Sequence, residues 1–190
     1  MNPSDGFTAP ANAVDSRIPG WPHVSESQAD FEVIYFPQNR ADTSRYDMAE
    51  MLCKVNGLRM SRGLHPVVYH SDLEKLAQGH AQFQSRYRVI THADKSGHIG
   101  DRLTALGFQW DILLENIGAG ANDVSGIFNA WVRSQDHLNN LLSADVRFMG
   151  VDVSNGFWVQ DFAAPRDKNY AVPLNEIDAC PSADRVVIYS

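Results

Sequence analysis

Apolar residues recur at intervals of three and four along the chain up to residue 142, and this period predicts helices. The longest such stretch predicts a helix over residues 44–62. A second helix is expected to begin at Ser71, because Ser71 and Glu74 have the spacing of a capping box. Three shorter helices are predicted: one over 99–106, one capped by Asp123 and reaching Trp131, and one capped by Asp136 and ending at Leu142.

The period changes to two near the end of the chain, which predicts strands. Apolar residues alternate over 149–153 and resume over 157–162, and the intervening Asn155-Gly156 is a hairpin turn signal. A further edge strand is expected over 186–189. Helices followed by a hairpin predict an α+β fold, in which helices cover a small antiparallel sheet.

The composition fits one globular domain with an extension at each end. The chain has 190 residues, of which 44% are hydrophobic and 21% charged, close to the averages of globular proteins. Residues 1–40 hold five of the nine prolines and are expected to form an N-terminal extension, whose apolar stretch 31–36 packs on the domain. The domain itself is predicted over 41–165, and a C-terminal extension over 166–190 is expected to pack on it.

The charge pattern argues against two classes of partner. The formal net charge is −7 and no cluster of basic residues is present, so binding to nucleic acid or to an anionic membrane by charge is disfavoured. No apolar run is long enough to predict a transmembrane helix. Residues 1–6 lack the basic region and the apolar core of a signal peptide, so no signal peptide is expected in this chain.

Three polar residues are candidates for chemistry. His92 and His137 lie near predicted helix ends, and Glu115 lies in an apolar stretch, where it is either exposed by alternation or buried with a partner. They are 23 and 22 residues apart, so either the fold brings them together or they are unrelated hydrogen-bonded side chains. The chain has no P-loop, HExxH, GxSxG or CxxC motif. Its two cysteines, Cys53 and Cys180, form either one disulfide or two buried thiols.

Several segments match a family pattern in order and spacing. They are residues 51–59, 63–67, 73–81, 91–92, 100–103, 107–108, 115–120, 130–142, 149–151 and 158–162. Together they resemble the CAP superfamily, which comprises the cysteine-rich secretory proteins, antigen 5 and the plant pathogenesis-related proteins. The resemblance is closest to the cysteine-poor bacterial and fungal members, and it runs from about residue 46 to residue 163.

The resemblance implies an α-β-α sandwich with a central cleft that holds two histidines and two acidic residues. His92, Glu115 and His137 stand at the positions of both histidines and one acid. Two imidazoles and one carboxylate, with water in the remaining position, make a borderline site for Zn²⁺ or another divalent metal.

The second acid of the family pattern is missing from this sequence. Its position is taken by the neutral Ser134, and whether Asp94 or Asp136 replaces it stays open. Without that acid the cleft lacks a charge and a general base that is not a metal ligand. No catalytic residue is therefore predicted, and on balance the chain is expected to be non-enzymatic.

The resemblance also implies secretion and a ligand. Family members are associated with sterol and fatty-acid binding and with host–microbe interaction, so an extracellular protein that binds a small apolar ligand is the leading expectation. Phe108 and Trp110 are the candidate ligand-binding side chains. A Cys53–Cys180 disulfide is implied by a first-helix cysteine in similar fungal-type sequences. Two alternatives remain: a zinc-dependent hydrolase such as a peptidase, and a structural interaction domain with a relict cleft.

Overall fold

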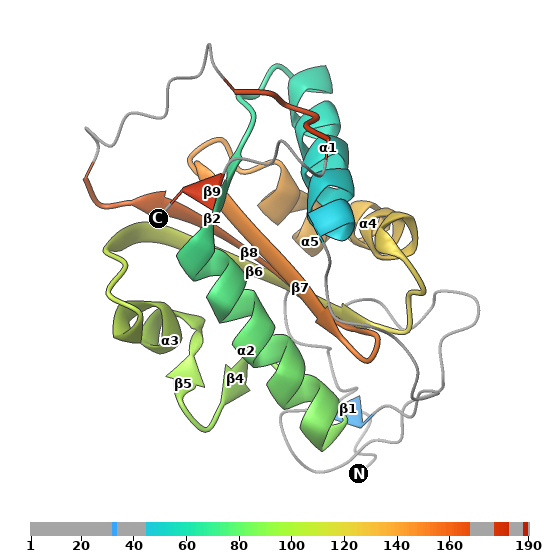
Figure 1. The fold of residues 1–190 in the computed structure, drawn as a ribbon, viewed down its shortest axis with the longest axis vertical. Helices are drawn as coiled ribbons and strands as arrows, with labels where there is room; N and C mark the ends of the chain where they lie inside the picture. The colour runs from blue at the N-terminus through green and yellow to red at the C-terminus, as the bar shows by residue number, and fades with distance from the viewer. Residues whose placement is uncertain (1–31, 34–44, 168–176, 183–187, 190) are drawn as a thin grey trace, which may run out of the picture.

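The computed structural model describes residues 32–33, 45–167, 177–182 and 188–189, which form a sheet between two layers of helices (Figure 1). The elements in chain order are β1 Glu32–Val33, α1 Arg45–Ser61, β2 Val68–His70, α2 Ser71–Tyr87, β3 Val89–Ile90, β4 Ala93–Asp94, β5 Gly97–His98, α3 Ile99–Ala105, β6 Trp110–Ala119, α4 Val124–Arg133, α5 Gln135–Leu141, β7 Phe148–Ser154, β8 Phe157–Pro165 and β9 Ile188–Tyr189. The predicted α-β-α sandwich is confirmed. No described helix is long and apolar enough to cross a membrane.

The central sheet has five described strands, in the order β6-β8-β7-β2-β9. β6, β8 and β7 run antiparallel, as predicted, whereas β2 pairs parallel to both β7 and β9. The sheet is therefore mixed and not wholly antiparallel. Parallel strands need a long crossover connection, and the helices between β2 and β7 provide it. β9 falls within the predicted edge strand, of which residues 186–187 lie outside the described residues.

The β7–β8 hairpin turns at Asn155 and Gly156, as predicted. Asn155 has a φ of 48° and Gly156 a φ of 82°. Both values lie in the left-handed region that a two-residue type I′ turn requires, and Asn and Gly adopt this region most readily. The turn sets the register in which Ser154 pairs with Phe157 and Phe148 with Ala163.

Alternate residues of each strand face the two helical layers. Along β6, Ile117 packs in a cluster with α2 residues, whereas Leu114 packs against the cluster built by α1, α4 and α5. Glu115 shares the α2 face with Ile117, because side chains two positions apart in a strand point to the same face. Trp131 and Trp158, expected to be core residues, are fully buried on the opposite face.

Close contact between α2 and β7 depends on Gly150. A Cβ atom added to Gly150 would collide with the backbone of Leu73 and Glu74. The missing side chain lets α2 lie directly on the sheet, which it crosses in Figure 1. α2 and α3 thus form the layer that covers Glu115.

Two helix starts and one strand differ from the predictions. α2 is capped by His70, whose Nδ1 accepts from the backbone N–H of Asp72 at 3.1 Å, and not by Ser71. α5 has Ser134 at its N-cap position, so Asp136 lies inside the first turn. β6 is absent from the predicted elements, because the polar residues within it break the two-residue period.

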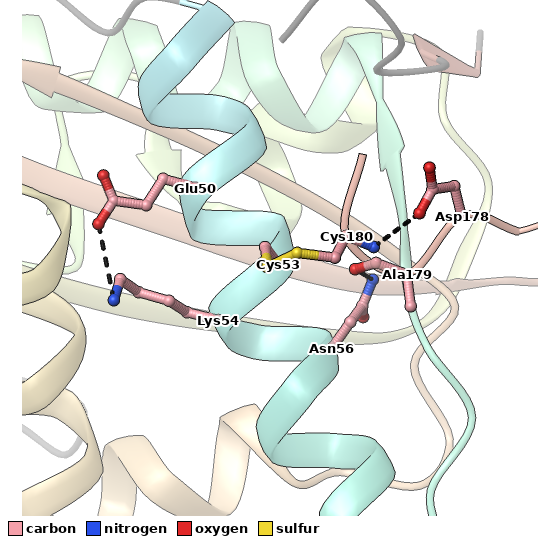
Figure 2. The surroundings of a disulfide bond; sticks show 7 residues. All are labelled: Glu50, Cys53, Lys54, Asn56, Asp178, Ala179 and Cys180. Carbon is pink, nitrogen blue, oxygen red and sulfur yellow. Dashed lines mark hydrogen bonds and ion pairs between the residues drawn. A yellow bond between two sulfur atoms is a disulfide. The ribbon is translucent and has the colours of Figure 1, made fainter. Parts of the chain in front are cut away.

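The segment 177–182 is fixed to α1 by the Cys53–Cys180 disulfide (Figure 2). Asn56 Nδ2, one turn along α1, donates to the carbonyl oxygen of Ala179 at 3.1 Å and so fixes the segment a second time. The disulfide implied by the family resemblance is confirmed, and the alternative of two buried thiols is excluded.

The predicted extensions are described only in part. Within 31–36, β1 pairs antiparallel with β3, so this piece of the N-terminal extension contacts the domain. The rest of residues 1–44, and residues 168–176, 183–187 and 190, lie outside the described residues. The boundaries of the predicted domain, 41–165, stay predictions.

Candidate functional site

The buried carboxylate of Glu115, on β6, is the centre of the candidate site. Glu115 is 2% exposed, and each of its two oxygens has a partner. Oε1 lies 2.8 Å from Nδ1 of His92, and Oε2 accepts from Nη2 of Arg102 at 2.9 Å. Of the two alternatives left open by the sequence, burial with a partner is correct.

Two segments on the α2 side of the sheet bring these partners to Glu115. His92 lies between β3 and β4, and Arg102 lies on α3. The start of α3 is fixed by Asp101, whose carboxylate accepts from the backbone N–H of His98 at 3.0 Å. Arg102 Nη2 also donates to the carbonyl oxygen of His92 at 3.2 Å, so one guanidinium holds both the carboxylate and the histidine.

A second carboxylate, that of Asp94, extends this network. Asp94 Oδ2 lies 3.7 Å from Nη1 of Arg102 and 3.4 Å from Nδ1 of His80. Nε2 of His80 donates to the carbonyl oxygen of Thr91 at 2.6 Å, and burial lowers the pKa of this histidine. We refer to His80, His92, Asp94, Arg102 and Glu115 as the ionic cluster.

Glu115 keeps its negative charge although it is buried. Burial alone would raise the pKa of its carboxyl, but His80, the hydrogen bond to His92 and the charge of Arg102 together lower the pKa below its ordinary value. Glu115 is therefore ionised at neutral pH and satisfied by its neighbours.

Asp161 on β8 lies directly opposite Glu115 in the β6–β8 ladder. It is fully buried, and its carboxyl lies beside that of Glu115. Burial, reinforced by the charge of Glu115, raises the pKa of Asp161 well above its ordinary value, although Arg102 opposes the shift. The shifts of the two carboxyls thus have opposite directions, and the negative charge is favoured on Glu115.

His137, the third predicted site residue, is fully buried on α5, in the opposite helical layer. Its carbonyl oxygen accepts from Nδ2 of Asn116, the residue after Glu115, at 3.4 Å. Asn140 of the same helix donates to the carbonyl oxygen of Glu115 at 3.2 Å. The structure therefore joins the side chains of His92 and Glu115 directly, and links α5 to β6 through the side chain of Asn116 and the backbone of Glu115.

Comparison with known proteins decides which family this architecture represents. The model of the cysteine-rich secretory protein family, CAP, matches residues 52–162, which includes β6, the hairpin and every residue of the ionic cluster. The chain belongs to the CAP family. The family and the Cys53–Cys180 disulfide fit an extracellular protein.

Individual relatives of this CAP domain are distant. The uncharacterized protein YkwD of Bacillus subtilis (strain 168) is 26% identical over 110 residues, which are 56% of this chain and 43% of YkwD. An extracellular SCP-domain protein of Bacillus anthracis has a TM-score of 0.58 at 25% identity, over 60% of this chain and 39% of that one. An outer surface protein of Borrelia burgdorferi has a TM-score of 0.60 at 21% identity, over 66% of this chain and 98% of that one. The chain spans less than half the length of its Bacillus relatives.

The carboxylate of the zinc site that the family resemblance implies is engaged by other partners in this CAP cleft. No group of three or more His, Cys, Asp or Glu side chains in the described part of the chain is arranged to hold a metal ion. Both oxygens of Glu115 are occupied, and one of their partners is the cation Arg102. Asp94, weighed as a replacement for the missing acid, contacts Arg102 and His80. Zinc binding by His92, Glu115 and His137 remains an untested prediction that this arrangement does not favour.

The two predicted ligand-binding aromatics lie at one end of the α2–α3 layer. Phe108 and Trp110 are half-buried and pack against the core that α2 and α3 share with the sheet. The ring of Phe108 lies 4.9 Å from that of His70, in an edge-on arrangement. Trp110 donates from Nε1 to Thr104 Oγ1 at 3.2 Å, and its ring lies against Gly100. Both aromatics therefore combine a packing role with a partly exposed surface.

Arg102 and Asp161 are site residues that the sequence interpretation missed. Asp161 had a usable signal: it stands in the alternation of Phe157 and Val159, so it faces the same layer as those buried residues. Arg102 precedes the buried Leu103 in a short helix, and nothing local distinguishes it from a solvated arginine.

Proposed function

We propose that this CAP domain is a non-enzymatic binding module of an extracellular protein, and that it binds a small apolar molecule such as a sterol or a fatty acid. The observation that carries the non-enzymatic part is the state of Glu115. Its two oxygens are held by His92 and Arg102, at 2.8 Å and 2.9 Å.

A hydrolase needs a group that is free to take up a proton. Glu115 is committed to two partners, and its pKa is lowered by them despite its burial. Asp161 is fully buried, so a substrate in solution cannot reach its carboxyl. Ser134 is neutral at the position where the family pattern has its second acid. These three features argue against acid–base catalysis by the cleft carboxyls.

Support for an apolar ligand comes from the border of the α2–α3 layer. Six half-buried apolar side chains pack against the core at this border and keep part of their surface exposed: Ile99, Phe108, Trp110, Leu113, Ile177 and Tyr189. A ligand that covered these side chains would remove apolar surface from water, at a gain of about 25 cal/mol for each Å². A sterol or an acyl chain has the chemistry to do this.

The direct test is equilibrium binding of labelled cholesterol and labelled palmitate to this chain. We expect saturable binding of one of them, weakened about tenfold by Trp110→Ala, because truncation of a buried aromatic anchor removes more than about 1 kcal/mol. Tyr87→Ala is the matched control, since Tyr87 is 52% exposed at the end of α2 and should leave affinity unchanged. Absence of saturable binding of both lipids would remove this proposal.

A hydrolase is the second candidate, and one observation favours it. His92 is oriented by Glu115 through Nδ1, while its Nε2 has no hydrogen-bond partner among the described residues. An imidazole oriented in this way by a carboxylate is the arrangement of a general base. Hydrolysis of a casein substrate that is lost in His92→Ala would establish the hydrolase. If the chain shows neither lipid binding nor turnover, the third alternative is left, which is an interaction domain with a relict cleft.

A further inference from the structure

We infer that Arg102 is the built-in cation of this CAP cleft: its guanidinium occupies the space between the carboxylates of Glu115 and Asp94 and thereby keeps divalent metal ions out. This inference concerns the ionic cluster alone, so it stands or falls independently of the apolar ligand proposed above.

The contacts of Arg102 place its charge inside the cluster. Arg102 is buried, with 8% of its surface exposed. Nη2 lies 2.9 Å from Glu115 Oε2, and Nη1 lies 3.7 Å from Asp94 Oδ2, so the guanidinium lies between the two carboxylates. The hydrogen bond from Nη2 to the carbonyl oxygen of His92 fixes the guanidinium in this position.

The residues around this guanidinium are ones that otherwise bind divalent metals. Glu115 and Asp94 contribute carboxylates, and His80 and His92 contribute imidazoles. Imidazole nitrogens and carboxylate oxygens are the ligands that zinc takes from proteins besides thiolates. As they lie in the described structure, these side chains do not form a group of three that could hold a metal ion, so metal binding needs them to close on the space that the guanidinium fills.

Charge explains why the guanidinium and a metal ion exclude each other. A guanidinium keeps its positive charge, and two cations a few ångström apart in a buried site repel strongly. Glu115 Oε2 also accepts from Nη2 of the guanidinium, so this carboxylate has one lone pair fewer to offer a metal ion. Nε and Nη1 of Arg102 have no hydrogen-bond partner among the described residues, so the arginine is held mainly by its charge and by the Nη2 contacts.

Replacement of Arg102 by an uncharged side chain of similar length should therefore create a metal site. Isothermal titration of the chain with Zn²⁺ is expected to show no saturable site in the wild type and one site in Arg102→Met, with affinity at least about 100-fold higher. Arg102→Lys retains the charge and should resemble the wild type. Adding Glu115→Gln to Arg102→Met should abolish the new site, because it removes a carboxylate ligand. Arg86→Met, which removes an exposed arginine of α2, is the matched control and should not bind Zn²⁺.

Two results would overturn the inference. One is a stoichiometric Zn²⁺ site in the wild type that His92→Ala removes while Arg102 is intact. The other is a folded Arg102→Met variant that binds Zn²⁺ no more tightly than the wild type. If Arg102→Met is unfolded when purified without metal, Zn²⁺ is expected to restore its native circular dichroism spectrum, and failure to restore it would equally contradict the inference.

Discussion

Two buried arginines, Arg59 and Arg102, serve different purposes on opposite faces of the same sheet. Arg59 of α1 is fully buried and donates only to carbonyl oxygens: from Nε to His65, and from Nη1 to Leu141 and Ser143, each at 2.9 Å. Arg102 of α3 contacts carboxylates. Arg59 satisfies backbone carbonyl oxygens, whereas Arg102 compensates the negative charge of buried carboxylates.

The contrast shows which buried polar groups bear on function. Burial and the charge of Arg147 lower the pKa of Arg59 to about 10, and within the part of the chain that the structure describes no carboxylate offsets this shift. Its role is structural, because backbone carbonyls need donors in any sequence that adopts this fold. The acids beside Arg102 pair mainly with side chains: Glu115 with His92 and Arg102, and Asp94 with Arg102 and His80, although Asp94 also accepts from the backbone N–H of Ser96. Their burial together is the reason we propose this face of the sheet as the site.

The largest effect on stability is expected from Arg59→Met. Three carbonyl oxygens in buried or partly buried hydrogen bonds lose their donor, which should lower the free energy of unfolding by about 4 kcal/mol. Because carbonyls do not titrate, the loss should be the same at pH 5 and pH 7. Urea denaturation at the two pH values measures it, and a loss that changed with pH would contradict a purely structural role.

Arg102→Met should cost about 3 kcal/mol at neutral pH when metal is excluded by a chelator, because it leaves the charge of Glu115 buried without its cation. Arg102 contributes to the lowered pKa of Glu115, and a lowered carboxyl pKa adds stability that is present above the unfolded-state value and lost as the pH falls. The difference in free energy of unfolding between Arg102→Met and the wild type should therefore become smaller as the pH falls. Urea denaturation at pH 5 and pH 7 tests this. If the difference in free energy of unfolding did not change with pH, the role of Arg102 would be purely structural, like that of Arg59.

Asp161→Asn should have the smallest effect on the free energy of unfolding, and it should raise that free energy where the two arginine variants lower it. A carboxyl with a raised pKa binds more protons in the folded chain than in the unfolded one, so the wild type loses stability as the pH rises from the ordinary aspartate pKa toward the raised value. The amide removes this loss, and the variant should be more stable than the wild type by about 1 kcal/mol or more at pH 7. Equal stability of the two proteins at pH 7 would mean that the pKa of Asp161 is not raised in the folded chain.

Local signals in the sequence predicted most of the fold. The helix over 44–62, the Asp123 cap, which accepts from Gly126 N–H at 2.7 Å, and the Asn155-Gly156 turn all depend on neighbours along the chain. β6 escaped prediction because Glu115 and Asn116 are buried through tertiary partners, which a two-residue period cannot reveal.

The candidate site was only partly predictable for the same reason. His92 and Glu115 were named from their sequence setting and from the family pattern, and their side chains contact each other across 23 residues. Arg102 was missed because an arginine on a helix is solvated unless another element buries it, and that element, β6, was itself not predicted. His70 replaced Ser71 as the cap of α2 because its imidazole reaches the Asp72 N–H.

The most direct test of the central claim, that Glu115 is a satisfied and ionised carboxylate, is its own titration, followed by the ¹³C chemical shift of the side-chain carboxyl. Burial without a cation would raise the pKa of Glu115, whereas contact with Arg102 and His92 lowers it. A midpoint below the ordinary value of a glutamate side chain is the result we predict. A midpoint above it would contradict the assignment of Arg102 as the cation of the cleft.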